Sequence, residues 1–259
     1  MNITIINDCR DANAVGRQLT RVSALIESPV SFVGVFSDLE AAGNLIDILD
    51  AYGDSPGVIL VNVAPRNGKA KKWENGTPFG YFWYKEILVV SSIDGLTLSL
   101  VKKLKLIDSI NVLDIPKVIE QLVEESLVSP EVGEHIINTQ FRSYDFLPRI
   151  AAYLLKNSNI QSENIAIKDI ADAPKAIWWV DNFGNCKTTL FGDEISRDGQ
   201  VSTRFGKTDY FEMLKDVPDK ATALITGSSG ISNKRFVELV VQGESAAQHL
   251  NIVAGDSIF

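Results

Sequence analysis

The segment WWVDNFGNCKTTL, residues 178–190, places an acid, an aromatic ring and an amide at alternate positions between two apolar runs. These side chains are Asp181, Phe183 and Asn185. A two-residue hairpin turn needs only Asn-Gly or Asp-Gly, so turn geometry alone does not explain the phenylalanine. The phenyl ring offers a π-face, Gly184 lets the chain turn without a Cβ clash, and Asn185 offers both a donor and an acceptor. Side chains of these types could hold a flat ligand with polar edges.

Two further segments carry residues that could complete such a site. Asp8 follows the apolar run at 3–6, where a carboxylate either caps the next helix or accepts hydrogen bonds from the two hydroxyls of a ribose. The segment TGSSGIS, residues 226–232, is either an ordinary turn or a place where backbone amides surround an anion such as a carboxylate. For each segment, the residues alone leave both alternatives open.

Other kinds of catalytic site find little support. His135 lies in a loop-like segment without an obvious acidic partner, and His249 lies at the end of an apolar helical stretch. These two histidines therefore do not indicate a Ser-His-Asp or Cys-His site. No G-x-G-x-x-G or Walker loop follows any predicted strand. Cys9 and Cys186 are far apart and have no metal-ligand spacing, which predicts neither a disulfide nor a zinc site.

The composition limits the partners. The chain has 259 residues, a formal net charge of −8 and a pI of about 4.9, which argues against nucleic acid and against an anionic membrane surface. The tight basic cluster of Lys69, Lys71 and Lys72 is interpreted as a solvated loop. No apolar run reaches the length of a membrane span, and the first residues are too polar for a signal peptide, so a soluble cytoplasmic protein is expected.

The expected secondary structure that positions these residues changes along the chain. Apolar runs at 3–6, 31–35, 57–64 and 81–92 alternate with helical patterns, with Asp38 as an expected N-cap. Such alternation predicts an α/β domain over residues 1–160 with a mostly parallel sheet, whose ligand would lie at the carboxyl ends of the strands. Short strands and turns from 163 to 259 predict a smaller β-rich domain, a barrel or sandwich.

Several of these segments resemble one known family. VDNFGNCKTTL resembles the I-D-x-F-G-N-x-x-T-N-I signature of the S-adenosylmethionine hydroxide adenosyltransferases, a family that includes fluorinating and chlorinating enzymes. GVILVNVAPRNG is similar to its strand and loop ending V-D-P-G-x-G, and VVSSIDGLTLSLV to its P-D-N-G-L-L segment. TQFRSYDFLPRIAAYL resembles T-F-H-G-R-D-I-F-A-P-V-A-A-H-L, and the stretch from ITGSSGIS to GESAA resembles G-S-x-G-x-L-E-I-A followed by G-S-A-A.

The resemblance implies an α/β domain, a C-terminal β-barrel and a homotrimer that binds a nucleoside between neighbouring subunits. By position, Asp8 would hold the ribose hydroxyls and Asp181 the methionine amino group. Phe183 would pack on adenine, Asn185 would bind its edge, and Ser228 and Ser229 would meet the methionine carboxylate. The implied chemistry is displacement at the ribose C5′, with neither a metal nor a redox cofactor, and S-adenosylmethionine as the substrate or ligand.

The chain departs from the family where the nucleophile is handled. The aspartate of V-D-P-G is Ala64, the following arginine falls on Lys71, the histidine of F-H-G-R-D is Arg142, and Lys187 replaces an apolar or aromatic residue. Ser143 matches the serine that fluorinating members place beside the halide. The sequence therefore leaves three hypotheses: cleavage by water assisted by Arg142 and Ser143, non-catalytic binding of S-adenosylmethionine or adenosine, and transfer to a halide.

Overall fold

The computed structural model describes residues 1–65, 78–156, 160–195 and 200–259. Lys69, Lys71 and Lys72 lie outside these ranges. The chain divides into two compact units, the first comprising Met1–Ile48 and Tyr52–Ala171 and the second Leu49–Ala51 and Asp172–Phe259. Each unit builds its own sheet, which confirms an α/β domain followed by a β-rich domain.

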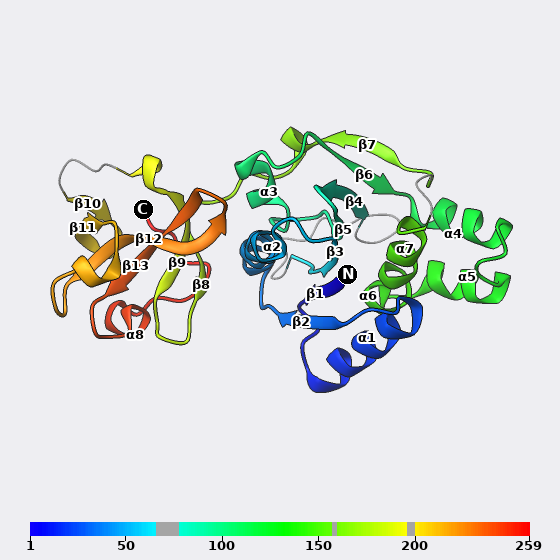
Figure 1. Cartoon of the computed structure of the whole chain (residues 1–259), viewed down its shortest axis with the longest axis horizontal. Coiled ribbons are helices and arrows are strands. Elements are labelled where there is room, and N and C mark those ends of the chain that lie inside the picture. The colour runs from blue at the N-terminus through cyan, green and yellow to red at the C-terminus, as the bar shows by residue number, and fades with distance from the viewer. Residues whose placement is uncertain (66–77, 157–159, 196–199) are drawn as a thin grey trace. The chain divides into compact units, whose positions relative to one another are not determined.

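The first domain contains a seven-stranded sheet in the order β2-β1-β3-β5-β4-β6-β7 (Figure 1). Its strands are β1 (Asn2–Asn7), β2 (Val30–Gly34), β3 (Gly57–Asn62), β4 (Phe79–Tyr84), β5 (Ile87–Ser92), β6 (Ser109–Leu113) and β7 (Glu163–Ala166). β2, β1, β3 and β5 are parallel, whereas β4, β6 and β7 add antiparallel pairs. The sheet is therefore mixed.

The antiparallel half arises in a segment predicted to be one strand. Residues 81–92 instead divide into β4 and β5, joined by a tight turn in which Lys85 takes a left-handed conformation with φ 52°. Lys85 and Glu86 are not typical turn residues, so the sequence gives little sign of this hairpin. Lys85 Nζ pairs with Asp54 Oδ1 at 2.8 Å on the protein surface.

Helices cover both faces of this sheet. They are α1 (Ala12–Leu25), α2 (Asp38–Tyr52), α3 (Ser99–Leu104), α4 (Ile115–Glu124), α5 (Pro130–Asn138), α6 (Arg142–Asp145) and α7 (Leu147–Leu154), with a 3₁₀ turn η1 (Ile167–Asp169). α1, α6 and α7 lie on one side of the sheet and α2 and α3 on the other (Figure 1). No helix of the described ranges is both long and apolar enough to cross a bilayer.

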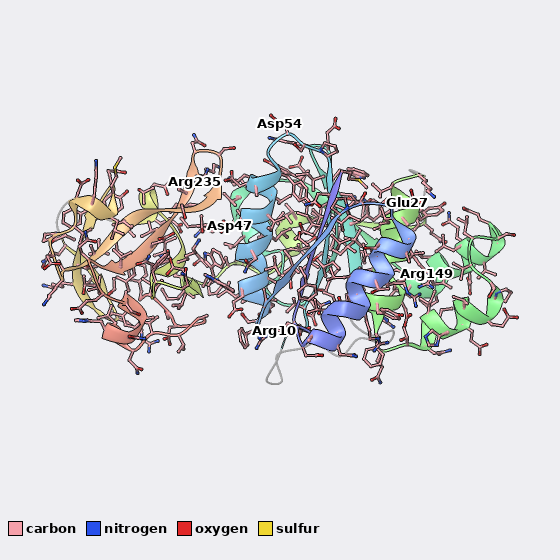
Figure 2. All side chains as sticks on the ribbon, turned by 60° about the horizontal axis from the view of Figure 1, so that its bottom comes forward. Arg10, Glu27, Asp47, Asp54, Arg149 and Arg235 are labelled. Carbon is pink, nitrogen blue, oxygen red and sulfur yellow. The ribbon has the colours of Figure 1, made fainter. Side chains whose placement is uncertain are left out.

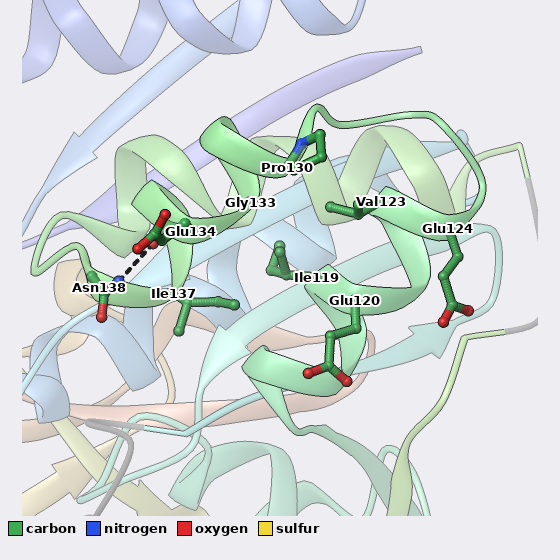
Figure 3. A pocket seen from close by; sticks show the side chains of 9 residues that line it. All are labelled: Ile119, Glu120, Val123, Glu124, Pro130, Gly133, Glu134, Ile137 and Asn138. Carbon is green, nitrogen blue, oxygen red and sulfur yellow. Dashed lines mark hydrogen bonds between the residues drawn. The ribbon is translucent and has the colours of Figure 1, made fainter.

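The segment predicted to be loop-like around His135 is helical. Ser129 caps α5 by accepting a hydrogen bond from Val132 N, and Pro130 occupies the first turn, where its missing N–H costs nothing. α5 packs against α4, and a Cβ on Gly133 would come within 2.9 Å of Val123 Cγ2. Between the two helices lies an apolar pocket of about 420 Å³ with glutamates around it (Figure 3).

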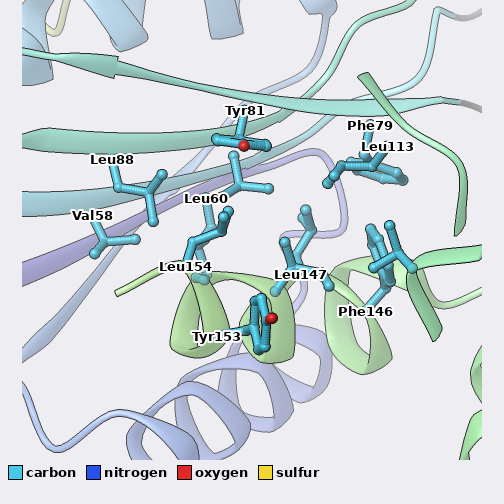
Figure 4. Close-up of a cluster of buried hydrophobic side chains, with 14 of the residues drawn as sticks. Val58, Leu60, Phe79, Tyr81, Leu88, Leu113, Phe146, Leu147, Tyr153 and Leu154 are labelled. Atoms are coloured by element: carbon cyan, nitrogen blue, oxygen red, sulfur yellow. The ribbon is translucent and has the colours of Figure 1, made fainter. Parts of the chain in front are cut away.

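The core of the first domain lies between the sheet and α7. Leu147 and Leu154 of α7 face Leu60 and Leu88 of the central strands (Figure 4), whereas the Tyr153 hydroxyl accepts a hydrogen bond of 3.0 Å from Gln121 Nε2 of α4. Buried side chains of α1, α4 and α5 extend the same cluster. This packing fixes the helices that carry several charged side chains described below.

The second domain contains a six-stranded sheet in the order β10-β11-β12-β13-β9-β8. Its elements are β8 (Ile177–Val180), β9 (Cys186–Phe191), β10 (Val201–Thr203), β11 (Gly206–Phe211), β12 (Thr222–Ile231), β13 (Lys234–Val241), α8 (Ala246–Leu250) and the 3₁₀ turns η2 (Gly192–Glu194) and η3 (Leu214–Asp216). Within the described ranges β10 and β8 are its two edges, so this sheet is open. The division between the domains falls after Ala171 rather than near residue 160, because β7 pairs with β6 of the first sheet.

Candidate functional site

The predicted turn between β8 and β9 is fixed by the carboxylate of Asp181. Its Oδ1 accepts hydrogen bonds from the backbone N–H groups of Phe183 and Asn185, each at 2.9 Å. Its Oδ2 accepts from Asn185 Nδ2 at 3.1 Å. Two backbone hydrogen bonds of 3.0 Å, from Gly184 N to Asp181 O and from Asp181 N to Asn185 O, close the turn. Three of the residues predicted to form the site therefore act as one unit.

This turn exposes the ring of Phe183. The residue is 72% exposed, whereas nearby Trp178 and Cys186 are 1% and 0% exposed. A single exposed aromatic is not unusual in itself. A rigid turn that holds the ring away from the core is what a stacking surface for a base requires.

Gly184 lets a second segment approach the turn closely. It adopts φ +86°, and a Cβ there would lie 1.9 Å from Ser245 Oγ and 2.9 Å from Ser245 Cα. Gly184 O accepts a hydrogen bond of 2.9 Å from Ala247 N at the start of α8. The fold thus brings together the two segments that resemble F-G-N and G-S-A-A.

Ser228 and Ser229 lie in β12 rather than in a turn, at an irregularity in its pairing with β13 between Thr226 and Gly230. Ser228 is exposed, and its N–H donates to Glu238 Oε1 at 3.3 Å. Ser229 is 2% exposed, and its hydroxyl accepts a hydrogen bond of 2.5 Å from Lys187 Nζ. Lys187 thus has a structural task, since it also stands opposite Glu238 across the β9–β13 pair.

Asp8 stands in the first domain, at the end of β1, in a connection held by buried amides. Asn7 Nδ2 donates to Gln18 Oε1 at 2.7 Å, Asn7 Oδ1 accepts from Cys9 N at 2.8 Å, and both amide residues are buried. Asp8 does not cap α1, because Asp11 accepts the hydrogen bonds of the first helical amides. The capping alternative for Asp8 is therefore wrong, and the ribose alternative stays a prediction.

Asp38, after β2, has a role that the sequence did not indicate. Asp38 is not an N-cap, since Ser37 Oγ takes that role by accepting from Glu40 N at 3.1 Å. Asp38 Oδ2 instead accepts from Leu96 N at 2.8 Å, beside Gly95, whose φ is +70°. A Cβ on Gly95 would lie 2.3 Å from that oxygen.

An aromatic ring on the connection after β2 contacts a cation on the connection after β1. Phe36 is 65% exposed, and Arg10 Cζ lies 3.3 Å from the centroid of its ring. Glu40 accepts a hydrogen bond of 2.7 Å from Phe36 N. Burial raises the pKa of the Glu40 carboxyl, while the Phe36 hydrogen bond and the Arg10 charge oppose that rise. A cation–aromatic pair at a strand end is a second place in this domain where a ligand could be held.

Ala64 follows β3 at the position where the resemblance expects an aspartate. The chain there is fixed by Ser92, whose hydroxyl donates to Val63 O at 2.9 Å and accepts from Val63 N at 3.1 Å. The backbone is thus rigid, but a methyl group cannot orient or deprotonate water. Lys71, the position of the expected arginine, lies outside the described residues.

Arg142 and Ser143 begin the short helix α6, which contacts α1 and β3. Arg142 is half-buried, and burial lowers the pKa of its guanidinium. On the same helix Asp145, 5% exposed, lies 3.4 Å from His135 Nε2. His135 therefore has the acidic partner that the sequence did not show, because the pair forms only when α5 packs beside α6.

The eight predicted residues belong to both domains. Asp8, Arg142 and Ser143 lie in the first unit, and Asp181, Phe183, Asn185, Ser228 and Ser229 lie in the second. In the described parts of the chain, no group of three or more His, Cys, Asp or Glu side chains is placed to hold a metal ion.

The same two-domain fold occurs in solved structures. One is an uncharacterized conserved protein from Thermotoga maritima, with a TM-score of 0.67, 17% identity and 98% of each chain covered. Another is a conserved hypothetical protein from Thermus thermophilus, with a TM-score of 0.62, 16% identity, and 98% of this chain and 97% of that chain covered. No protein-family model and no curated protein matches the chain. At these identities the similarity shows the fold alone.

Proposed function

We propose that the chain binds S-adenosylmethionine with the adenine against Phe183, and cleaves it by displacement at the ribose C5′. The observation that carries the binding part is the 72% exposed ring of Phe183 on a turn held by three hydrogen bonds, which Asp181 accepts from Phe183 and Asn185. A ring fixed before binding loses little conformational entropy when a base stacks on it.

The polar groups of the turn fit the edges of this ligand. Asn185 uses its Nδ2 within the turn, which leaves its side-chain oxygen to accept from the adenine amino group. A carboxylate has about four acceptor positions, so Asp181 can hold the turn and also pair with the methionine ammonium. Asp8 would accept hydrogen bonds from the two ribose hydroxyls.

The proposed nucleophile is water. Its oxygen forms a bond to C5′ while the bond from C5′ to sulfur breaks, so methionine leaves as a neutral thioether and the water proton goes to solvent. This leaving group needs no general acid, so alignment and removal of bulk water are the main tasks. Arg142 would stabilise the developing hydroxide and Ser143 would orient the water.

The resemblance suggests a homotrimer in which each site takes residues from two subunits, a cytoplasmic location, and no metal or redox cofactor. Light scattering coupled to size-exclusion chromatography measures the mass directly. A mass of three chains supports the shared site, and a monomer that still binds the nucleoside refutes it.

A non-catalytic binder is the second candidate, and Ala64 favours it. An alanine where the hydrolytic members carry an aspartate removes one water-handling group, while the nucleoside-facing residues of the turn are present. A protein of this kind would hold S-adenosylmethionine or adenosine without turnover.

One assay separates these candidates. Purified protein is incubated with S-adenosylmethionine, and the products are separated by chromatography with and without added chloride or fluoride. Adenosine in excess over protein supports the hydrolase, and a halogenated nucleoside would instead show halide transfer. Calorimetric binding without products supports the binder, and an unchanged rate in Arg142→Ala removes Arg142 from the mechanism.

A further inference from the structure

A second cavity, of about 390 Å³, lies wholly within the first domain among α1, α5, α6 and α7. Three arginines line it, Arg17 and Arg21 from α1 and Arg149 from α7 (Figure 2 labels Arg149). His135 and Thr139 lie at its margin. None of these residues belongs to the nucleoside site proposed above.

The three guanidinium groups make their hydrogen bonds and ring contacts with neutral groups. Arg17 Cζ and Arg21 Cζ lie 4.7 and 4.2 Å from the centroid of the Tyr144 ring. Arg21 Nη2 also donates to the Tyr144 hydroxyl at 2.7 Å, and Arg149 Nη1 donates to Asp145 O at 2.7 Å. Across the ranges that the structure describes, none of the three forms an ion pair with a carboxylate. A guanidinium carries five N–H donors, so most of these donors remain for a ligand.

Two carboxylates, Glu131 and Asp145, also line the cavity, and their hydrogen bonds go to groups other than the three arginines. Asp145 Oδ2 accepts from Thr139 Oγ1 at 3.0 Å and lies 3.4 Å from His135 Nε2. Hydrogen bonds from its own backbone N–H and from Ser129, at the start of α5, lower the pKa of Glu131. Three arginines and two carboxylates line the cavity, which leaves an excess of positive charge there in a chain whose formal net charge is −8.

The arginines also repel one another. Burial lowers the pKa of Arg149, the nearby charge of Arg21 lowers it further, and the charges of Asp145 and Tyr144 partly oppose that fall. Like charges held close together, one of them half-buried, cost free energy unless an anion lies between them. The fold keeps them there through the α1, α6 and α7 packing.

We propose that this cavity binds a phosphate monoester. Arginine suits the phosphate group because its planar donors form paired hydrogen bonds with phosphate oxygens. The volume falls within the range of small-molecule sites, about 300–1,000 Å³, and so leaves room beside the phosphate for an organic group. Val132, Ile136 and Phe141, which also line the cavity, supply apolar contacts for that group.

Calorimetry at constant ionic strength tests this proposal with three probes: inorganic phosphate, phenyl phosphate and phenol. We expect saturable binding of phenyl phosphate, weaker binding of inorganic phosphate, and no binding of phenol. Binding of neither phosphate at millimolar concentration would overturn the proposal. Phosphate binding that the phenyl group does not strengthen would overturn the organic part of it.

Variants then locate the site. Arg17→Ala and Arg21→Ala should each weaken phenyl phosphate binding at least about tenfold, the size of a lost charge-assisted hydrogen bond. Arg21→Lys should also lose affinity, since an ammonium cannot form paired hydrogen bonds. Lys117→Ala removes one charge from α4 outside the cavity and should bind like the wild type.

An equal loss in Lys117→Ala would mean that only long-range charge matters, and unchanged binding in both arginine variants would place the ligand elsewhere. Arg17 is exposed on α1, where alanine favours the helix, so this variant tests the site even if Arg21→Ala unfolds. The proposal does not depend on the nucleoside site. Phe183→Ala should leave phenyl phosphate binding unchanged.

Discussion

The Asp181–Asn185 turn and the arginine cavity differ in how their polar groups are satisfied. In the turn, the carboxylate, the amide and the backbone pair with one another, and the ring of Phe183 stays 72% exposed. In the cavity, the guanidinium groups contact neutral partners, and the unsatisfied property is charge. Each region therefore complements a different proposed ligand, a flat π-system at the turn and an anion in the cavity. The two regions should therefore respond differently to mutation: variants of the turn should lose stability, whereas Arg17→Ala at the exposed edge of the cavity should not.

The largest expected effect is that of Gly184→Ala on stability. A left-handed backbone costs a non-glycine residue roughly 1–2 kcal/mol, and overlap of the new methyl with the backbone of Ser245 adds to that cost. Urea unfolding followed by tryptophan fluorescence should show a loss above about 3 kcal/mol. Gly255→Ala is the matched control, because its φ is +96° and nothing lies within 4 Å of the added Cβ. Equal losses in the two variants would mean that the contact with Ser245 is not close.

Asp181→Ala should have the next largest effect. It removes the acceptor of three hydrogen bonds, each worth about 1 kcal/mol, so the free energy of unfolding should fall by roughly 2–3 kcal/mol. Asp181→Asn keeps one oxygen for the two backbone donors and should cost less.

The same pair of variants sharpens the ligand assignment. Asp181→Asn removes the charge that would meet the methionine ammonium, so it should weaken S-adenosylmethionine more than adenosine. If both ligands weaken equally, Asp181 acts only through the shape of the turn.

Arg17→Ala should leave stability almost unchanged, in contrast to the turn variants. It removes a contact with the Tyr144 ring but also reduces the positive charge at the cavity, so a change within about 0.5 kcal/mol is expected. The same urea unfolding measurement applies. A large destabilisation would show that the arginines serve the fold, and the contrast between the two regions would then disappear.

The smallest expected effect is on the chemical modification of Cys186, whose thiol becomes accessible only if the Asp181–Asn185 turn opens. The pKa of the Cys186 thiol is raised to about 12, mostly by burial and further by the charges of Asp181, Asp256 and Glu238. The thiol therefore stays protonated at pH 8, and a thiol reagent should modify only the exposed Cys9 in the native protein. Asp181→Ala should speed the second modification, whereas rapid modification of two thiols in the wild type would contradict a closed turn.

The sequence predicted the parts of this molecule that depend on local pattern. Strands β1, β2 and β3 and helix α1 follow from apolar periodicity, and the change to short strands predicts a second, β-rich domain. The Asp181–Asn185 turn was predictable as a unit because its residues are close in the chain. The β4–β5 hairpin was not, because Lys85 and Glu86 carry no turn signal, and the sheet was therefore expected to be mostly parallel.

Tertiary packing produced what the sequence could not show. His135 and Asp145 are ten positions apart on different helices, and Arg17, Arg21 and Arg149 meet only when α1 packs beside α7. A cation that lacks a carboxylate partner cannot be recognised until its neighbours are known. The roles of Asp8, Arg142, Ser143, Ser228 and Ser229 stay predictions from the resemblance.

Calorimetry of S-adenosylmethionine with the wild type, Phe183→Ala and Phe259→Ala tests the central claim most directly. Stacking of a base on an aromatic ring is worth about 1–3 kcal/mol, so Phe183→Ala should weaken binding roughly 5- to 150-fold. Phe259 is another exposed phenylalanine of the same domain, at 47%, and its removal should leave the affinity unchanged. Wild-type protein that binds no S-adenosylmethionine, or a Phe183→Ala variant that binds it as tightly as the wild type, would contradict the account.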